Sequence, residues 1–275
     1  MARLDPDRLL TPEQLDALDR NNLLLVDVGD PQRYARTHIP GAVHVAPQEL
    51  IAGTQPAPGE LPELSRLEAL FARLGLSPDT LVVAYDDEGG GWAGRFIWTL
   101  EVIGHQRWAY LDGGLHAWHG AGMPLTDEPM IPEPRPQQLQ LHRELIASAD
   151  ELLEALARDD ANLLIWDARS PEEYRGEKVV ARRGGHIPGA VNVDWLELMD
   201  RDRDLRLRED LVEYLAARGI NGDRPLVTHC QTHHRSGLTW LVARLLGFPQ
   251  PRAFPGSWGD WGNRDDTPVQ QGDRP

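Results

Sequence analysis

The chain has 275 residues, a formal net charge of -15 and one cysteine. Its length suits two domains of ordinary size, and one cysteine excludes both an internal disulfide and a two-cysteine redox or zinc motif. The strong negative charge argues against nucleic acid as a partner, because a phosphate backbone is bound by a clustered basic face.

The N-terminal segment, residues 1–10, contains charged residues and no apolar run. We therefore expect no signal peptide there. No stretch of the chain approaches the roughly 20 apolar residues that span a bilayer, so we expect a cytoplasmic protein with no membrane partner. Directly after this segment, Thr11 and Gln14 have the spacing of a capping box and predict the start of a helix.

A repeat begins with the first apolar run. Residues 23–27 (LLLVD) recur as residues 163–167 (LLIWD), at an offset of 140 residues, and 38–43 (HIPGAV) recur as 186–191, at an offset of 148. The second copy has therefore gained eight residues between these two motifs. The repeat indicates a duplicated domain.

Within each copy, short runs of Val, Leu and Ile alternate with segments of helical period. This pattern is typical of a parallel sheet with helices on both faces. We expect an α/β fold with two tandem domains, each an open parallel β-sheet flanked by helices. In the second copy the expected strands are 163–167, 190–193, 225–229 and 252–254, and the expected helices lie near 149–158, 209–218 and 235–246, the first preceded by a capping box of Ser148 and Glu151.

A proline-rich segment separates the two copies. Residues 126–142 contain Pro129, Pro132, Pro134 and Pro136, and such a composition disfavours helix and sheet and suits a stiff extended linker. We therefore expect an N-terminal domain over residues 1–125, a linker over 126–142 and a C-terminal domain over 143–275.

The loop after the apolar run 81–85 contains a misleading motif. Residues 89–94 (GGGWAG) fit the dinucleotide-binding pattern G-x-G-x-x-G. The loop opens with Asp86, Asp87 and Glu88, however, and three carboxylates disfavour a pyrophosphate. We reject nucleotide binding for this loop.

The corresponding loop of the second copy contains the only cysteine. The apolar run 225–229 leads directly to Cys230, and a helical segment follows the loop. Backbone N–H groups can converge at such a loop, and the positive end of the helix dipole adds to them, so an anion or a thiolate fits there. We expect a pKa for this thiol below its ordinary value. The loop consists of Cys230, Gln231, Thr232, His233, His234 and Arg235.

These features resemble the tandem-domain bacterial rhodaneses. The resemblance covers the whole chain and rests on the repeat, on HIPGA in both halves, on the loop 230–235 (CQTHHR) and on residues 256–259 (GSWG). It implies a catalytic C-terminal domain and an inactive N-terminal one. The first copy agrees, because it has Asp86 where the second has Cys230.

The resemblance implies a thiosulfate:cyanide sulfurtransferase in which Cys230 is the nucleophile and carries a persulfide. It also implies that residues 231–235 bind the donor and that Trp195 lies in the cleft. The expected partners are a small anionic sulfur donor and a nucleophilic acceptor, which is cyanide, a small thiol or a thiol of a partner protein. We expect no metal, no organic cofactor and a monomer.

Several of these residues could have a structural role instead of a functional one. Arg235 could brace the loop carbonyls, Trp195 could pack in a core, and the adjacent His233 and His234 could simply be solvated. The histidines around Cys230 could also form a metal cluster, although their spacing matches no structural zinc pattern. We expect Asp167 and Arg169 to brace the loop, and His38 and His186 to be structural. Arg182 and Arg183, in the eight-residue gain, could steer anions toward the cleft.

Two other classes of protein remain as alternatives. A phosphatase or arsenate reductase on the same kind of fold would also use a cysteine and an arginine on an anion-binding loop. Those phosphatases resemble this chain but have five residues between the two, whereas four separate Cys230 from Arg235. A non-catalytic binding module is disfavoured, because it would be expected to lose the cysteine, as the first copy has done.

Overall fold

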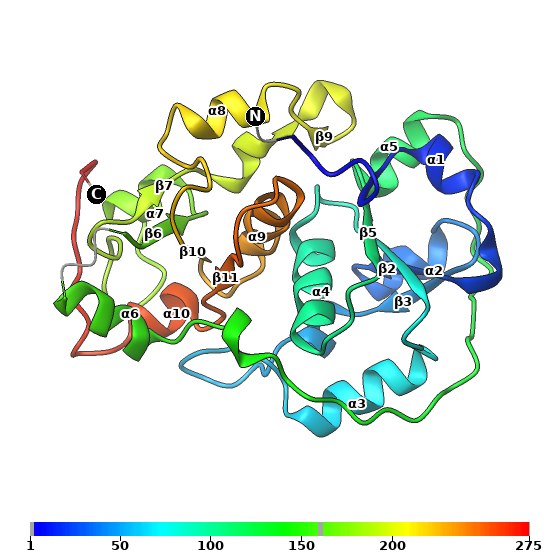
Figure 1. Cartoon of the computed structure of the whole chain (residues 1–275), viewed down its shortest axis with the longest axis horizontal. Coiled ribbons are helices and arrows are strands. Elements are labelled where there is room, and N and C mark those ends of the chain that lie inside the picture. Colours follow the sequence, from blue (N-terminus) through cyan, green and yellow to red (C-terminus); the bar gives the residue numbers. More distant parts are fainter. Residues whose placement is uncertain (1–2, 159–161, 275) are drawn as a thin grey trace.

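The N-terminal half is built around a five-stranded parallel sheet (Figure 1). The computed structural model describes residues 3–158 and 162–274, so residues 1–2, 159–161 and 275 of the predicted domains lie outside the described residues. In the order β1-β5-β4-β2-β3, the strands are β1 (Leu9–Leu10), β5 (Trp108–Leu111), β4 (Leu81–Tyr85), β2 (Leu23–Val28) and β3 (Ala42–Val45). Its helices are α1 (Pro12–Asp16), α2 (Pro31–Arg36), α3 (Leu64–Arg73), α4 (Gly91–Val102) and α5 (Gly114–Gly120).

The C-terminal half repeats this plan with a four-stranded parallel sheet. In the order β11-β10-β6-β7, its strands are β11 (Arg252–Ala253), β10 (Leu226–His229), β6 (Leu164–Asp167) and β7 (Val191–Asn192), and β8 (Met199–Asp200) pairs with β9 (Arg206–Leu207) in a separate antiparallel ribbon. Its helices are α6 (Ala149–Ala157), α7 (Pro171–Arg175), α8 (Leu211–Ala216), α9 (Arg235–Leu245) and α10 (Ser257–Trp261). The predicted α/β fold is confirmed, and the predicted elements of the second copy end within two residues of the observed ones.

Local sequence signals start two of the helices as predicted. Before α1, the Gln14 amide donates to the Thr11 hydroxyl (3.3 Å) and the Thr11 amide donates to the Gln14 side chain (2.8 Å). Ser148 and Glu151 make the same reciprocal pair before α6. Both capping boxes satisfy N–H groups that have no partner within the helix.

The two halves meet where α4 and α9 pack against each other at the centre of the molecule (Figure 1). A Cβ atom at Gly94 would collide with the backbone of Gly237, and one at Gly237 would collide with the backbone of Gly91. The helices therefore touch backbone to backbone. Beside this crossing, Arg244 on α9 forms an ion pair with the buried Glu101 on α4 (2.8 Å). One hydrophobic cluster contains core residues of both halves.

The segment between the halves is extended and runs along the outside of the N-terminal half, past α3 (Figure 1). The Arg135 amide donates to the Ala72 carbonyl (2.8 Å), and the His142 amide donates to the Val102 carbonyl (2.7 Å). Ile131, near its middle, is 83% exposed. We interpret residues 126–142 as the linker between the domains.

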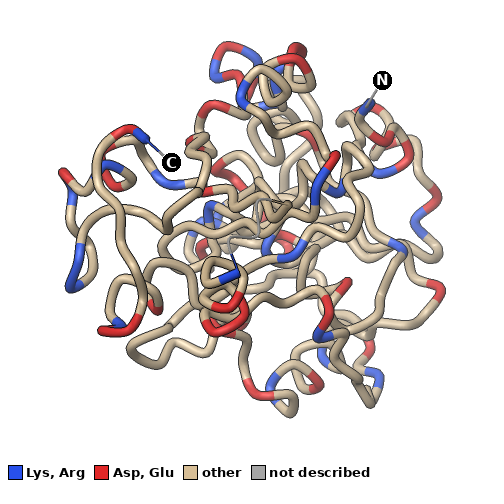
Figure 2. The backbone as a smooth tube through the Cα atoms, turned by 60° about the vertical axis from the view of Figure 1, so that its left-hand side comes forward, with Lys and Arg blue, Asp and Glu red and all other residues tan. Residues whose placement is uncertain are grey.

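Acidic and basic residues are mixed over the surface of the molecule. Figure 2 shows Lys and Arg interspersed with Asp and Glu along the backbone rather than gathered on one face. In residues 3–158 and 162–274, no helix has the length and apolar character needed to cross a membrane.

Candidate active site

The Cys230 loop joins the end of β10 to the start of α9, and the segment that begins α10 shapes it. The Trp258 amide donates to the Cys230 carbonyl (2.9 Å), and the Gly259 amide donates to the Gln231 carbonyl (2.9 Å). The Ser257 hydroxyl accepts from the amides of Cys230 (3.3 Å) and His233 (3.1 Å). The GSWG segment, residues 256–259, therefore holds the loop in place.

The Cys230 side chain is fully buried. Burial raises the pKa of its thiol, whereas the charge of Arg235 and hydrogen bonds from the Ser236 side chain and from the Ser236 and Thr232 amides lower it. The net result is a pKa below the ordinary value, as expected. The loop therefore favours a thiolate.

Arg235 is fixed by a carboxylate from another element. Its Nη1 and Nη2 atoms donate to the two oxygens of Glu173 on α7, at 2.6 and 2.9 Å. Glu173 is buried, and this bidentate pair holds the guanidinium within electrostatic reach of the Cys230 sulfur. Sequence reasoning missed Glu173, because nothing in the local pattern connects two residues that lie 62 positions apart.

The two histidines of the loop have different surroundings. His234 is partly exposed, hydrogen-bonds with Glu88 of the N-terminal half, and stacks on Trp92 with ring centroids 4.4 Å apart. Trp195 approaches the same ring edge-on (5.4 Å). The structure thus brings together His234 and Trp195, two residues predicted to bind the donor.

His233 lies elsewhere. Its side chain is fully buried, and its Nδ1 atom is 2.7 Å from the Ser236 hydroxyl. This position differs from the one expected of a donor-binding residue, because the ring has no exposed surface. Burial, with the nearby charges of Arg95 and His234, holds the pKa of His233 well below its ordinary value.

Gln231 and Thr232 are partly exposed. The Gln231 side chain donates weakly to the Val180 carbonyl (3.4 Å). Gly59 of the N-terminal half lies so close to the Thr232 carbonyl that a Cβ atom would not fit between them. The loop is therefore enclosed from the other domain as well as from its own.

Asp167 and Arg169 form a buried ion pair with each other, and the bracing of the Cys230 loop that we expected of them stays a prediction. Arg169 Nη2 donates to Asp167 (2.6 Å) and to the Gly185 carbonyl (2.7 Å), and its guanidinium lies over the Trp258 ring (4.3 Å). His38 and His186 are buried and bonded to backbone carbonyls, which fits a structural role.

The eight-residue gain does not present two free arginines. Arg183 Nη1 donates to the Thr267 carbonyl (2.7 Å) and its Nη2 donates to the Trp261 carbonyl (2.9 Å), so this side chain clamps the segment to the domain. Arg182 is exposed and pairs with Asp265 (2.8 Å). Arg183 therefore has a structural role, and the Asp265 carboxylate offsets the charge of Arg182; steering of anions by either arginine stays a prediction.

The corresponding loop of the first copy contains an anion of its own. Asp86 Oδ1 accepts from the amides of Glu88 (3.2 Å), Gly89 (3.1 Å) and Gly90 (2.8 Å), and Oδ2 accepts from Ala93 (3.0 Å). Burial and Glu88 raise the pKa of Asp86 to about 6, against the opposing effect of these amides. The Asp86 carboxylate is therefore the acceptor that these four loop amides share.

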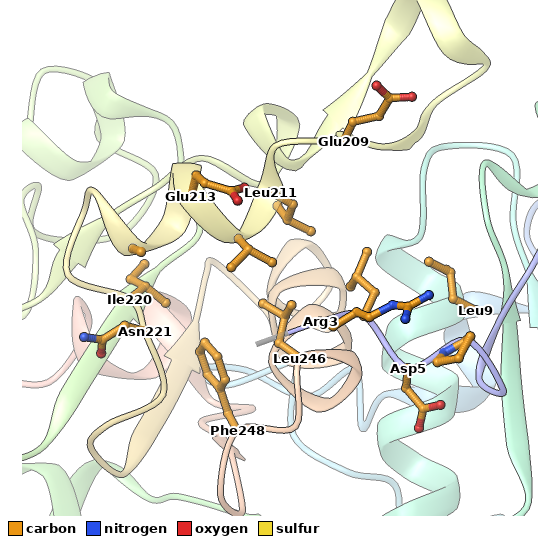
Figure 3. Close-up of a pocket in the computed structure, with 14 residues that line it drawn as sticks. Arg3, Asp5, Leu9, Glu209, Leu211, Glu213, Ile220, Asn221, Leu246 and Phe248 are labelled. Atoms are coloured by element: carbon orange, nitrogen blue, oxygen red, sulfur yellow. The ribbon is translucent and has the colours of Figure 1, made fainter. Parts of the chain in front are cut away.

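A groove of about 750 Å³ lies on another part of the molecule, between the N-terminal segment, α8 and the end of α9 (Figure 3). Its floor is largely aliphatic and its rim is charged. The Cys230 loop does not line it, so this groove is not the candidate active site. Its lining includes Asp5, Leu9, Glu209, Leu211, Leu246 and Phe248.

Across the described part of the chain, no three His, Cys, Asp or Glu side chains are grouped so that they could hold a metal ion. The reactive features are instead a thiol in an N–H-lined loop and a fixed arginine beside it. The fold and this loop thus place a thiol, in surroundings that favour its thiolate form, between a parallel strand and a helix.

The family described as "Rhodanese-like domain" matches residues 11–121 and 148–264. The chain is 54% identical to a thiosulfate sulfurtransferase of Azotobacter vinelandii, covering 95% of this chain and 96% of that protein. It is 51% identical to one of Pseudomonas aeruginosa, covering 90% and 91%. This protein therefore belongs to the rhodanese family, as the sequence predicted.

A solved structure shares the fold. An anaerobic ergothioneine biosynthesis enzyme from Chlorobium limicola, in complex with trimethyl histidine, superposes with a TM-score of 0.86. The sequence identity is 22%, and the match covers 99% of this chain and 72% of that one. At this identity the comparison supports the fold alone.

Proposed function

We propose that this protein is a thiosulfate sulfurtransferase that carries sulfur as a persulfide on Cys230. The predicted class of reaction, sulfur transfer, is confirmed by two full-length relatives at 51% and 54% identity. The observation that carries the assignment to Cys230 is its thiol, which has a lowered pKa and lies in an N–H-lined loop beside Arg235.

The first half-reaction loads the enzyme. The Cys230 thiolate attacks the outer sulfur of thiosulfate, an S–S bond forms, and the bond to the sulfonate sulfur breaks. Sulfite leaves with that electron pair, and the enzyme retains a persulfide anion. The loop amides and the Arg235 guanidinium face this negative charge and stabilise it.

The second half-reaction transfers the outer sulfur from the enzyme to an acceptor. A nucleophile such as cyanide attacks the outer persulfide sulfur, the S–S bond breaks, and thiocyanate leaves while the Cys230 thiolate is restored. A small thiol or a thiol of a partner protein can take the place of cyanide in the same step. We propose a small anionic donor, a nucleophilic acceptor and a monomeric enzyme.

The positions of the loop side chains support different roles. Gln231, Thr232, His234 and Trp195 are partly exposed and suit contact with the donor or acceptor. The Cys230 side chain has no exposed surface, so a donor reaches the sulfur only after neighbouring side chains move. This requirement favours small donors such as thiosulfate.

Intact-mass measurement tests the proposal. The purified protein is measured before thiosulfate, after thiosulfate and again after cyanide, with Cys230→Ser as the control. We expect the wild type alone to gain the mass of one sulfur atom and to lose it to cyanide. A wild type that gains no sulfur, and instead hydrolyses an aryl phosphate or reduces arsenate, would contradict the proposal.

A further inference from the structure

The groove beside α8 (Figure 3) has a counterpart in the first half of the chain. Residues 67–76 (LEALFARLGL) align with residues 211–220 (LVEYLAARGI), at an offset of 144 residues. The first segment contains most of α3, and the second contains α8. Both segments bury the residues at their two ends, which are Leu67, Leu76, Leu211 and Ile220. The two helices therefore have equivalent places in their domains.

In the first half, the linker covers the C-terminal end of this helix. The Arg135 amide donates to the Ala72 carbonyl (2.8 Å). The Gln137 side chain donates to the Leu76 carbonyl (2.8 Å). The equivalents of Ala72 and Leu76 in the second half are Ala216 and Ile220, and both of these line the groove.

The linker also supplies apolar side chains to this place. Leu139 and Leu141 pack against the hydrophobic core that the two halves share. The Leu139 amide donates to the Glu68 carboxylate (3.1 Å). An extended segment with apolar side chains two residues apart therefore fills the place beside α3.

Two equivalent glycines show that the place beside α8 is open. A Cβ atom added at Gly75 would lie 2.4 Å from the carbonyl oxygen of Glu133 in the linker. At Gly219, no atom of the described residues beyond the chain neighbours lies within 4 Å of that position. Ala72 is only partly exposed, whereas Ala216 is exposed. Nothing in the described chain thus takes the place of the linker beside α8.

The N-terminal segment forms one side of the groove. The Asp5 amide donates to the Leu245 carbonyl at the end of α9 (2.8 Å), just as the His142 amide donates to the Val102 carbonyl at the end of α4 (2.7 Å). The N-terminal segment therefore corresponds to the end of the linker. No described residue corresponds to the earlier part of the linker, residues 131–139.

The carbonyl at the end of α8 retains room for a second donor. The Ala72 carbonyl accepts from the Gly75 amide (3.0 Å) as well as from Arg135 of the linker. The Ala216 carbonyl accepts from the Gly219 amide (3.0 Å), and residues 3–158 and 162–274 contain no second donor to it. A carbonyl oxygen has two lone pairs, so a further backbone amide can bind there.

The groove differs from its counterpart in charge. Glu213 takes the place of Ala69, and Val212 takes the place of Glu68. The charged residues of the lining are three carboxylates and one guanidinium: Asp5, Glu209, Glu213 and Arg3 (Figure 3). The lining is therefore net negative around an apolar floor. Such a groove is complementary to a segment with apolar side chains and a basic residue.

We propose that the groove beside α8 binds an extended segment of a partner protein, in the way that α3 binds the linker. The segment has apolar side chains two residues apart and a basic residue, and one of its backbone amides donates to the Ala216 carbonyl. The Cys230 loop precedes α9 and the groove lies at the other end of that helix. A partner bound in the groove therefore leaves the candidate active site free.

Fluorescence anisotropy with the full-length protein tests this inference. The probe is a capped, labelled peptide of residues 131–141 with Glu133→Gln, which leaves Arg135 as its only charge. We expect saturable binding in the micromolar range, because so short a segment buries a small area. The same peptide with Leu139→Ser and Leu141→Ser should not bind, because it lacks the apolar side chains.

Variants of α8 assign the binding to the groove. Ala216→Trp places an indole in the groove, and we expect it to weaken peptide binding at least about tenfold. Ala217→Trp is the matched control, because Ala217 is also exposed at this end of α8 but does not line the groove. It should change the affinity less than about twofold. Thermal unfolding checks that both variants fold.

A second variant tests the charge of the groove. Glu213→Lys changes an exposed residue, and we expect it to weaken binding of the peptide because it places a cation beside the peptide's arginine. This variant decides the question if Ala216→Trp does not fold.

Three results would overturn the inference. The first is a peptide that does not bind at millimolar concentration, and the second is equal binding of the peptide without leucines. The third is binding that Ala216→Trp and Glu213→Lys leave unchanged, because such a peptide binds elsewhere. Dimerisation of the protein that Ala216→Trp abolishes would assign the groove to a second copy instead. These measurements do not involve Cys230, so their outcome is separate from that of the intact-mass test.

Discussion

The two strand-to-helix loops of the repeat have a similar backbone arrangement but surround different side chains. In the first, four amides donate to the Asp86 carboxylate. In the second, amides of the same kind of loop surround the Cys230 sulfur. The amides of a loop of this shape favour negative charge, but burial and Glu88 outweigh them in the first loop and raise the pKa of Asp86 to about 6. The side chain at the first position of the loop decides whether the group that the amides contact is a structural carboxyl group or a reactive thiol.

The residues around the two loops differ in the sign of their charge. The repeat aligns Arg33 with Glu173, and α4 begins with Gly91 where α9 begins with Arg235. Arg33 pairs with Asp27 (2.5 Å) and with Asp87 of the first loop (3.2 Å), whereas Glu173 fixes Arg235 beside the second loop. We expect activity to require both the cysteine and the fixed arginine beside it.

Converting the second loop into the first should have the largest effect. We expect Cys230→Asp to remain folded, because the loop amides can accept a carboxylate, and to lose sulfur uptake completely. Thermal unfolding and intact mass after thiosulfate measure the two properties. Sulfur uptake by this variant would show that another group carries the sulfur.

Removing the charge of Arg235 should have the next largest effect on activity. We expect Arg235→Met to lower kcat/KM for thiosulfate about 100-fold, because both the anionic donor and the persulfide lose a charged hydrogen-bond donor. Steady-state kinetics with cyanide as acceptor measures it. Arg252→Met, which removes an arginine that pairs with Glu151 (2.7 Å), is the control and should change kcat/KM less than twofold.

Glu173→Gln should mainly affect stability. The variant leaves Arg235 largely buried without its carboxylate, which we expect to cost about 3 kcal/mol of unfolding free energy at neutral pH. Burial raises the pKa of Glu173, but Arg235 lowers it more, so the folded pKa lies below the ordinary 4.5. The pair therefore stabilises the wild type above about pH 4.5, and this contribution is lost as the pH falls further. Denaturant unfolding at pH 7 and pH 3.5 should show a difference between wild type and variant that shrinks at the lower pH.

Removing the Asp86 carboxylate from the first loop should lower the unfolding free energy slightly less than Glu173→Gln does. Asp86→Ala removes the acceptor of four backbone amides, and we expect a loss of about 2–3 kcal/mol of unfolding free energy. The neighbouring Asp87→Ala, which loses one partly exposed ion pair with Arg33 (3.2 Å), should cost less than about 1 kcal/mol. Equal losses for the two variants would contradict a special role for the Asp86 carboxylate.

The smallest effect is expected in the segment that only the second copy has. Arg182 is exposed and already paired with Asp265. We expect Arg182→Ala to change the rate of reaction with thiosulfate by less than about twofold, even at low salt. A strong, salt-dependent loss of rate would support the steering hypothesis for this residue.

The sequence predicted what local pattern controls. Periodicity and turn residues placed the strands and helices, and the repeat pointed to Cys230 as the reactive counterpart of Asp86. Pairings such as Glu173 with Arg235 were not predictable, because they depend on how distant elements pack. The same is true of His233, which looks like a polar loop residue in the sequence. Its burial follows from the approach of Trp98 and Arg95, which belong to the other domain.

The linker described above makes the protein a natural candidate for expression in two pieces. Ile131 is strongly exposed, while the backbone on its C-terminal side is bonded to the N-terminal domain. A chain break at this point would leave α4 and α9 in backbone contact and their shared core closed. Two co-expressed fragments that end and begin there should therefore copurify and reassemble into one enzyme.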